Sequence, residues 1–174
     1  MNKILFLERL QKERDAFEIL LNRVGFTRQM TMKGVSGRMS VKDLLADILT
    51  REQFIADRLN EILHGESYAP CASYPALEDF YKLYGYPDYE SPLVEKEKLN
   101  HLVIYRHKNI GLDEIVSQEL ATYSNIIAAL EKLTHAQCLD HDLYHRMAEH
   151  TYKSYRRMSA EIHRWLKSIA AESK

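Results

Sequence analysis

Apolar side chains recur every three or four residues through most of this chain, which is the spacing that gathers them on one face of an α-helix. Four segments carry the pattern: 3–24, 41–64, 93–133 with an interruption at 109–111, and 140–170. Glycine and proline do not recur at the short intervals typical of all-β chains. We therefore predict an all-α protein in which four helices form one four-helix bundle domain over residues 1–174.

The predicted helix over 41–64 has the clearest boundaries in the sequence. Ser40 and Asp43 have the spacing of a capping box, in which each side chain bonds the backbone N–H of the other residue. Gly65 follows directly and favours termination of the helix there. These signals predict a helix that starts after Ser40 and ends before Gly65.

Two expectations concern the chain before this helix. Segment 25–39 is rich in threonine, methionine and glycine, and we predict a loop. Arg14 stands at the one position that interrupts the apolar spacing of the 3–24 helix. We expect its side chain to turn outward or to extend its charged end to solvent.

A long connection over 65–93 contains all four prolines and a group of tyrosines. We predict a short helix over 75–83, because a proline is well placed in a first helical turn. A structureless link of this length is uncommon inside a compact bundle, so we expect the connection to pack as a crossover or lid. Its tyrosines, with Tyr81 and Tyr84 among them, have two open interpretations, namely cover for the core and contact with a ligand.

Charge and the N-terminal residues narrow the functional classes. The formal net charge is −1, whereas nucleic-acid-binding domains usually carry a basic face, so we expect no nucleic-acid partner. The apolar run over 4–7 is too short for a signal peptide or a membrane span, and we expect a cytoplasmic protein without membrane contact. Two cysteines, Cys71 and Cys138, are too few for a disulfide framework, and we expect reduced thiols.

Polar residues interrupt the apolar face of two predicted helices. Asp47 lies beside the stripe of the 41–64 helix, and Thr151 and Ser154 occupy stripe positions of the 140–170 helix. Because an unsatisfied buried hydroxyl costs on the order of 1–3 kcal/mol, these residues need partners. One interpretation is a polar pocket between the second and fourth helices. The other is that the hydroxyls bond back to carbonyls of their own helix.

The neighbours of Asp47 offer further interpretations. Arg51 follows it by one turn, and our preferred hypothesis is an ion pair between the two side chains. His150 lies one turn before Ser154, at a position that approaches the same pocket. His141 and His145 are four residues apart, a spacing that can hold a metal from one helix face but that more often belongs to a surface.

Three segments give the chain a family resemblance. They are GVSGRMSVKDLLA at 34–46, the segment 99–105 that begins LN and ends IY, and the segment 150–165 that begins HTYKSY and ends IHRW. Together they resemble the DinB-like superfamily, specifically its ClbS/DfsB branch, over nearly the whole chain. The resemblance implies a four-helix bundle with up-down-down-up topology. It also implies a long crossover between the second and third helices.

Many DinB-like proteins hold a divalent metal with three histidines, one in the second helix and two in the fourth. The resemblance places these positions on Asp47, Ser154 and Met158, none of which is histidine. Serine is a poor ligand and methionine a soft one, so the set suits neither zinc nor nickel. We therefore expect no metal of the superfamily type and no cofactor.

The resemblance and the polar residues together predict a function. The branch includes ClbS-like proteins that resist a genotoxin by opening its strained ring, without the metal triad. We predict a protein that binds or detoxifies a small molecule in the pocket between the second and fourth helices. The predicted lining comprises Asp47, Arg51, His150, Ser154 and Met158, with Tyr81 and Tyr84 from the connection.

Two other functions remain as alternatives. A non-catalytic helical scaffold that forms a homodimer would have Asp47 paired and the core closed over it, whereas a binding protein needs a cleft there. A metal-dependent thiol transferase, known elsewhere in the superfamily, is less favoured because the three histidines are absent.

Overall fold

The computed structural model of this chain describes residues 2–25, 27–65, 103–140 and 142–173. Its helices there are α1 (Lys3–Val24), α2 (Thr27–Thr31), α3 (Val41–His64), α6 (Leu112–Lys132), α7 (His135–Asp140), α8 (Leu143–His150) and α9 (Tyr152–Glu172). Residues 103–107 are also helical, and the described residues contain no strand, only an isolated bridge between Ser36 and Met39. The predicted all-α class is therefore confirmed. None of the described helices combines the length and apolar character needed to cross a lipid bilayer.

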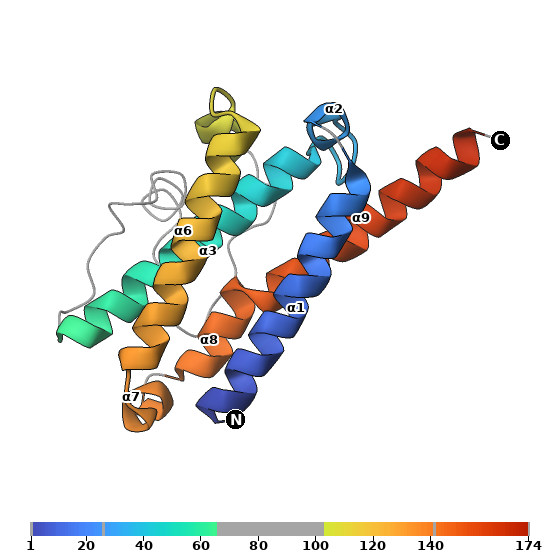
Figure 1. The fold of residues 1–174 in the computed structure, drawn as a ribbon. Helices are drawn as coiled ribbons and strands as arrows, with labels where there is room; N and C mark the ends of the chain where they lie inside the picture. The colour runs from blue at the N-terminus through green and yellow to red at the C-terminus, as the bar shows by residue number, and fades with distance from the viewer. Residues whose placement is uncertain (1, 26, 66–102, 141, 174) are drawn as a thin grey trace.

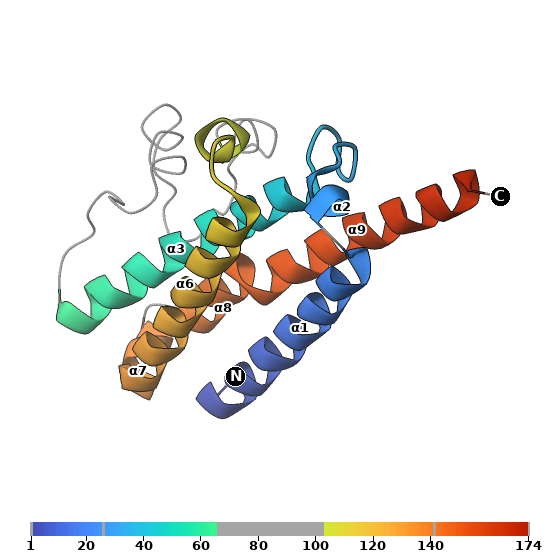
Figure 2. The ribbon, with the colours of Figure 1, turned by 45° about the horizontal axis from the view of Figure 1, so that its top comes forward.

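The long helices pack in two pairs around an apolar core. α3 makes its most extensive contacts with α6, while α1 lies along α9, and contacts of α3 with α8 and α9 join the two pairs. Figures 1 and 2 show these pairs, with α2 at one end of the molecule and α7 at the other. The core contains fully buried residues from each long helix and from α8: Phe6, Leu10, Ile48, Leu59, Ile115, Ile126, Met147 and Ile162.

The first two predicted long helices have the bounds expected from the sequence, and they correspond to α1 and α3. At the start of α3 the Ser40 Oγ accepts a hydrogen bond from the Asp43 N–H at 3.1 Å. Asp43 Oδ2 accepts in return from the Ser40 N–H at 2.8 Å, so the capping box is complete. Gly65 ends the helix with φ of 65°, a left-handed conformation that glycine adopts at little cost.

Other predicted boundaries need correction or fall outside the described residues. The loop expected over 25–39 contains the short helix α2. The predicted third helix is interrupted before Leu112 as expected, and its second part is α6. The predicted 75–83 helix, together with Tyr81 and Tyr84, lies outside the described residues.

The predicted continuous helix over 140–170 is wrong, because α7 ends at Asp140 and the described residues beyond it form two separate helices, α8 and α9. Asp142 has φ of 50°, which separates α7 from α8, and Thr151 has φ of −125° and ψ of −103°, which separates α8 from α9. At the second break the Thr151 hydroxyl donates to the Met147 carbonyl at 2.5 Å, and the Ser154 hydroxyl donates to the Glu149 carbonyl at 2.9 Å. Side-chain bonds of this kind are known to bend helices, and here they lie at the break between α8 and α9.

Candidate functional site

Asp47 is fully buried on α3 and forms the ion pair that the sequence suggested. Arg51 Nε donates to Asp47 Oδ2 at 3.0 Å, one helical turn further on. The second carboxylate oxygen, Oδ1, is buried and has no hydrogen-bond partner in the described part of the chain. A buried acceptor without a partner costs free energy, so among the described residues this oxygen is a candidate ligand contact.

His150 ends α8 next to this ion pair. Its ring packs against Phe54 of α3 with the centroids 5.1 Å apart. Its Nδ1 is buried, and no described residue hydrogen-bonds to it. Burial, followed by the positive charge of Arg51, lowers the pKa of His150 to about 3. The imidazole is therefore neutral at physiological pH. A strongly shifted group beside a charged partner is a frequent mark of a functional site.

Ser154 and Thr151 do not hydrogen-bond to Asp47. Both bond back to carbonyls preceding them, which is the second of the two interpretations that the sequence left open. Ser154 Oγ also accepts from Arg157 Nη2 at 2.9 Å, and the charge of Arg157 adds to the lowering of the His150 pKa. Met158, one turn beyond Ser154, is buried in the core.

The three positions on which the family resemblance places metal ligands, Asp47, Ser154 and Met158, do not fit a cation. Asp47 already pairs with Arg51, and Ser154 accepts from Arg157, so two guanidinium groups are held at the triad positions. Met158 adds only a soft thioether. No group of three or more histidine, cysteine, aspartate or glutamate side chains within the described residues is arranged to hold a metal ion. His145 is exposed, and the side chain of His141 is outside the described residues.

A second buried polar cluster centres on Arg14, and its position corrects the expectation of an outward side chain. Arg14 is 4% exposed. Its Nη1 and Nη2 donate to the two oxygens of Glu119 on α6, at 2.5 and 2.7 Å. Its Nε donates to Glu18 at 3.0 Å, and its guanidinium lies 3.8 Å from the centroid of the Tyr123 ring. The paired contacts with planar partners explain why a charge is tolerated inside the bundle.

Glu52 of α3 completes this cluster from the opposite side. It is fully buried, its Oε1 lies 3.7 Å from Arg14 Nη1, and it accepts a hydrogen bond from the Tyr155 hydroxyl. Burial and then the negative charge of Glu119 raise the pKa of Glu52 well above its usual value. Burial likewise raises the pKa of Tyr155, so its hydroxyl stays protonated at physiological pH.

The sequence carries a signal for this cluster in the positions of its charged residues. Arg14, Glu52 and Glu119 continue the apolar spacing of three different helices, so each must face the core. Each stands four positions after a fully buried residue of its own helix, and these residues are Leu10, Ile48 and Ile115. Charges of opposite sign on the inner faces of several helices indicate that they meet.

A pocket of about 280 Å³ opens beside the Arg14–Glu119 pair, between α1, α2, α3 and α6. Its walls are mainly apolar, with Phe17, Met30 and Ile115 among them. Arg14, Glu18 and Glu119 supply polar atoms. The pocket lies on a different side of α3 from the Asp47 ion pair, because Leu45 lines it and Asp47 does not.

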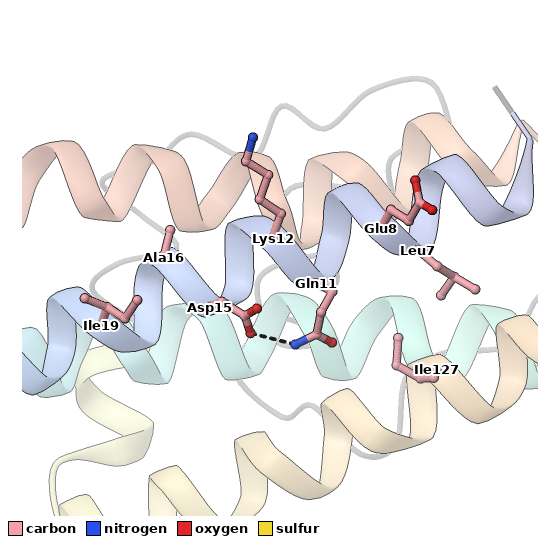
Figure 3. A pocket seen from close by; sticks show the side chains of 8 residues that line it. All are labelled: Leu7, Glu8, Gln11, Lys12, Asp15, Ala16, Ile19 and Ile127. Atoms are coloured by element: carbon pink, nitrogen blue, oxygen red, sulfur yellow. Dashed lines mark hydrogen bonds between the residues drawn. The ribbon is translucent and has the colours of Figure 1, made fainter.

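A larger open groove of about 720 Å³ runs along α1 beside α6. Figure 3 shows Leu7, Ile19 and Ile127 along it, with Glu8 and Lys12 on the same surface of α1. Ile19 is 62% exposed, although it is a large apolar residue. Gln11 and Asp15, which also line the groove, are joined by a hydrogen bond of 2.6 Å across one turn.

Comparison with known proteins gives a fold but no activity. No family model matches the sequence, and no curated protein matches it. The structure is similar to the crystal structure of an uncharacterised protein from Escherichia coli UTI89, with a TM-score of 0.68 at 12% sequence identity. The similarity covers 97% of this chain and 95% of that chain. At this identity the likeness shows a shared fold, and a shared fold does not specify a function.

Proposed function

We propose that this chain is a small-molecule-binding protein whose site is the Asp47–Arg51–His150 cluster between α3 and α8. The observation that carries the proposal is the pair of buried polar atoms without partners, Asp47 Oδ1 and His150 Nδ1. Two such atoms contributed by neighbouring helices would be costly in a closed core. A ligand that hydrogen-bonds to both would remove this cost.

The chemistry of the cluster defines the class of ligand. Asp47 Oδ1 only accepts hydrogen bonds when ionised, and the neutral imidazole of His150 can accept through Nδ1. Arg51 already balances the charge of Asp47. The matching ligand is therefore an uncharged molecule with two N–H or O–H donors, such as a primary amide or a urea. Tyr81 and Tyr84, predicted to line the same site, remain part of the proposal.

We further propose that the chain belongs to the ClbS/DfsB branch of the DinB-like superfamily and acts in the cytoplasm on a reactive small molecule. Its all-α fold supports this assignment, as do its four long helices, α1, α3, α6 and α9. The proposed topology is a four-helix bundle in the up-down-down-up order. Arginine side chains already bond Asp47 and Ser154, so thiol transfer at a metal is not part of the proposal.

The binding proposal is tested with a panel of small primary amides and ureas, each paired with its fully N-methylated analogue, which lacks donors. We expect some panel members to raise the melting temperature and their N-methylated analogues to have no effect. Asp47→Asn should abolish the response, because an amide presents a donor where the ligand needs an acceptor. Asp113→Asn is the matched control, since Asp113 is exposed on α6. Equal responses from donor and N-methylated compounds, or an unchanged response in Asp47→Asn, would refute the assignment.

The second function, a homodimeric scaffold, is favoured by the groove along α1 and also by Asp47, which is paired with Arg51 and fully buried as expected for a scaffold. The groove exposes Ile19, and it presents Glu8 and Lys12 one turn apart on the same face. Opposite charges spaced in this way are self-complementary when two copies of a helix pack antiparallel about a two-fold axis. A scaffold of this kind predicts a dimer by sedimentation that Ile19→Glu converts to a monomer. A monomer at all concentrations would exclude it.

A further inference from the structure

The pocket between α1, α2, α3 and α6 is apolar except where the Arg14–Glu119 ion pair forms part of its wall. Phe17, Met30 and Ile115 supply apolar surface. The volume of about 280 Å³ is near the lower limit for small-molecule sites, so it suits a fragment-sized molecule. Both ionic residues are almost entirely buried, yet both line the pocket.

The polar part of this pocket has more acceptors than donors. Arg14 directs Nε to Glu18 and its two terminal nitrogens to Glu119, so most of its N–H groups are engaged. A carboxylate has about four acceptor positions, and Glu119 takes only two hydrogen bonds from Arg14. Glu18 also lines the pocket, and its side chain is 50% exposed. Two carboxylates therefore share one guanidinium, so this part of the pocket has an excess of negative charge.

We propose that this pocket is a second ligand site that binds an organic cation, specifically an amine attached to a compact apolar body. The ammonium group hydrogen-bonds to Glu119 and Glu18, and the apolar body contacts the walls formed by Phe17, Met30 and Ile115. An anionic ligand would face both carboxylates, while the guanidinium that could attract it is already held by Glu119. An uncharged ligand would leave the surplus negative charge uncompensated. This site is independent of the proposed function, because Asp47 and His150 do not line it.

Three probes of similar shape test the charge preference: 2-phenylethylammonium, its uncharged isostere 2-phenylethanol, and 3-phenylpropionate. Binding is followed by amide chemical-shift changes in the full chain, since ligands of this size bind with dissociation constants in the millimolar range. We expect the ammonium probe to bind about fivefold more tightly than the alcohol and the carboxylate to bind most weakly. Added salt should reduce the preference. Equal affinity for ammonium and alcohol, tighter binding of the carboxylate, or no saturable binding would overturn the proposal.

Variants at the pocket's edge test the location without disturbing the buried ion pair. Val116 lines the pocket and is 39% exposed, so Val116→Trp should fill the space and abolish binding, whereas Val116→Ala should retain it. Glu18→Gln removes one half-exposed carboxylate and should weaken ammonium binding severalfold while leaving alcohol binding unchanged. Circular dichroism and the melting temperature verify that each variant is folded. Unchanged ammonium binding in both Val116→Trp and Glu18→Gln would place the cation elsewhere and refute the site.

Discussion

Replacement of Arg14 by methionine tests the buried cluster most severely. Methionine has a similar length but no charge, so Glu119 would stay buried without its bidentate partner. Arg14 is 4% exposed and Glu119 is 8% exposed, which makes solvent a poor substitute for the lost hydrogen bonds. Removal of one member of such a pair typically costs about 3–5 kcal/mol of unfolding free energy. In a chain of this size that loss lowers the melting temperature by about 6–20 °C.

The assay is urea denaturation monitored by circular dichroism, with the wild type and three variants measured together. Arg164→Met is the matched control, because the Arg164 side chain is 72% exposed and its pair with Glu161 should contribute at most about 0.5 kcal/mol. The double variant Arg14→Met/Glu119→Leu should recover most of the stability lost in Arg14→Met, since it leaves no buried charge unpaired. The single-variant loss should be smaller at pH 5 than at pH 8, because an unpaired buried carboxylate takes up a proton. A loss below about 1 kcal/mol in Arg14→Met would refute the description of this pair as buried and coupled.

Three further predictions concern single residues. Glu52 has a raised pKa in the folded state, so its contribution to the free energy of unfolding is fully present below the ordinary carboxyl pKa and declines as pH rises. Urea denaturation should therefore show Glu52→Gln gaining stability relative to the wild type between about pH 5 and 8. A stability difference that does not change with pH would contradict this. His150 has a pKa lowered to about 3, so wild-type stability should fall as pH decreases from about 6.5 toward 3, and His150→Asn should lose less over that range in the same assay. An identical acid dependence of the two proteins would show that His150 is protonated in the folded state. Ser40→Ala should cost about 1 kcal/mol through loss of the capping box, whereas Ser173→Ala at the exposed end of α9 should cost almost nothing in thermal unfolding.

The parts of the fold that could be predicted depend on local interactions. The bounds of α3 follow from a capping box and a terminating glycine, both of which act within a few residues. The Asp47–Arg51 pair follows from their spacing on one helix. The break at Thr151 could not be inferred from apolar spacing, because the stripe continues across it while the side-chain hydroxyl takes a backbone acceptor.

The Arg14–Glu119 pair was missed for a different reason. Its members are far apart in the sequence. A charged residue is expected at the surface unless a partner on another helix is known. Asp47 and Glu52 illustrate the difference: both are buried on α3, but only Asp47 has its partner within one turn. The family assignment and the bundle topology stay predictions, because the structural neighbour has 12% identity and is uncharacterised.

The central claim is that Asp47 Oδ1 and His150 Nδ1 are the contacts of a ligand, and imidazole nitrogen chemical shifts measure it directly. The free protein should show the shifts of a neutral His150 ring at pH 6, below the ordinary histidine pKa. Titration with the tightest-binding amide or urea of the panel should then shift the Nδ1 signal in wild type and leave it unchanged in Asp47→Asn. A charged His150 ring at pH 6, or an Nδ1 signal that does not respond to a bound amide or urea, would contradict the account.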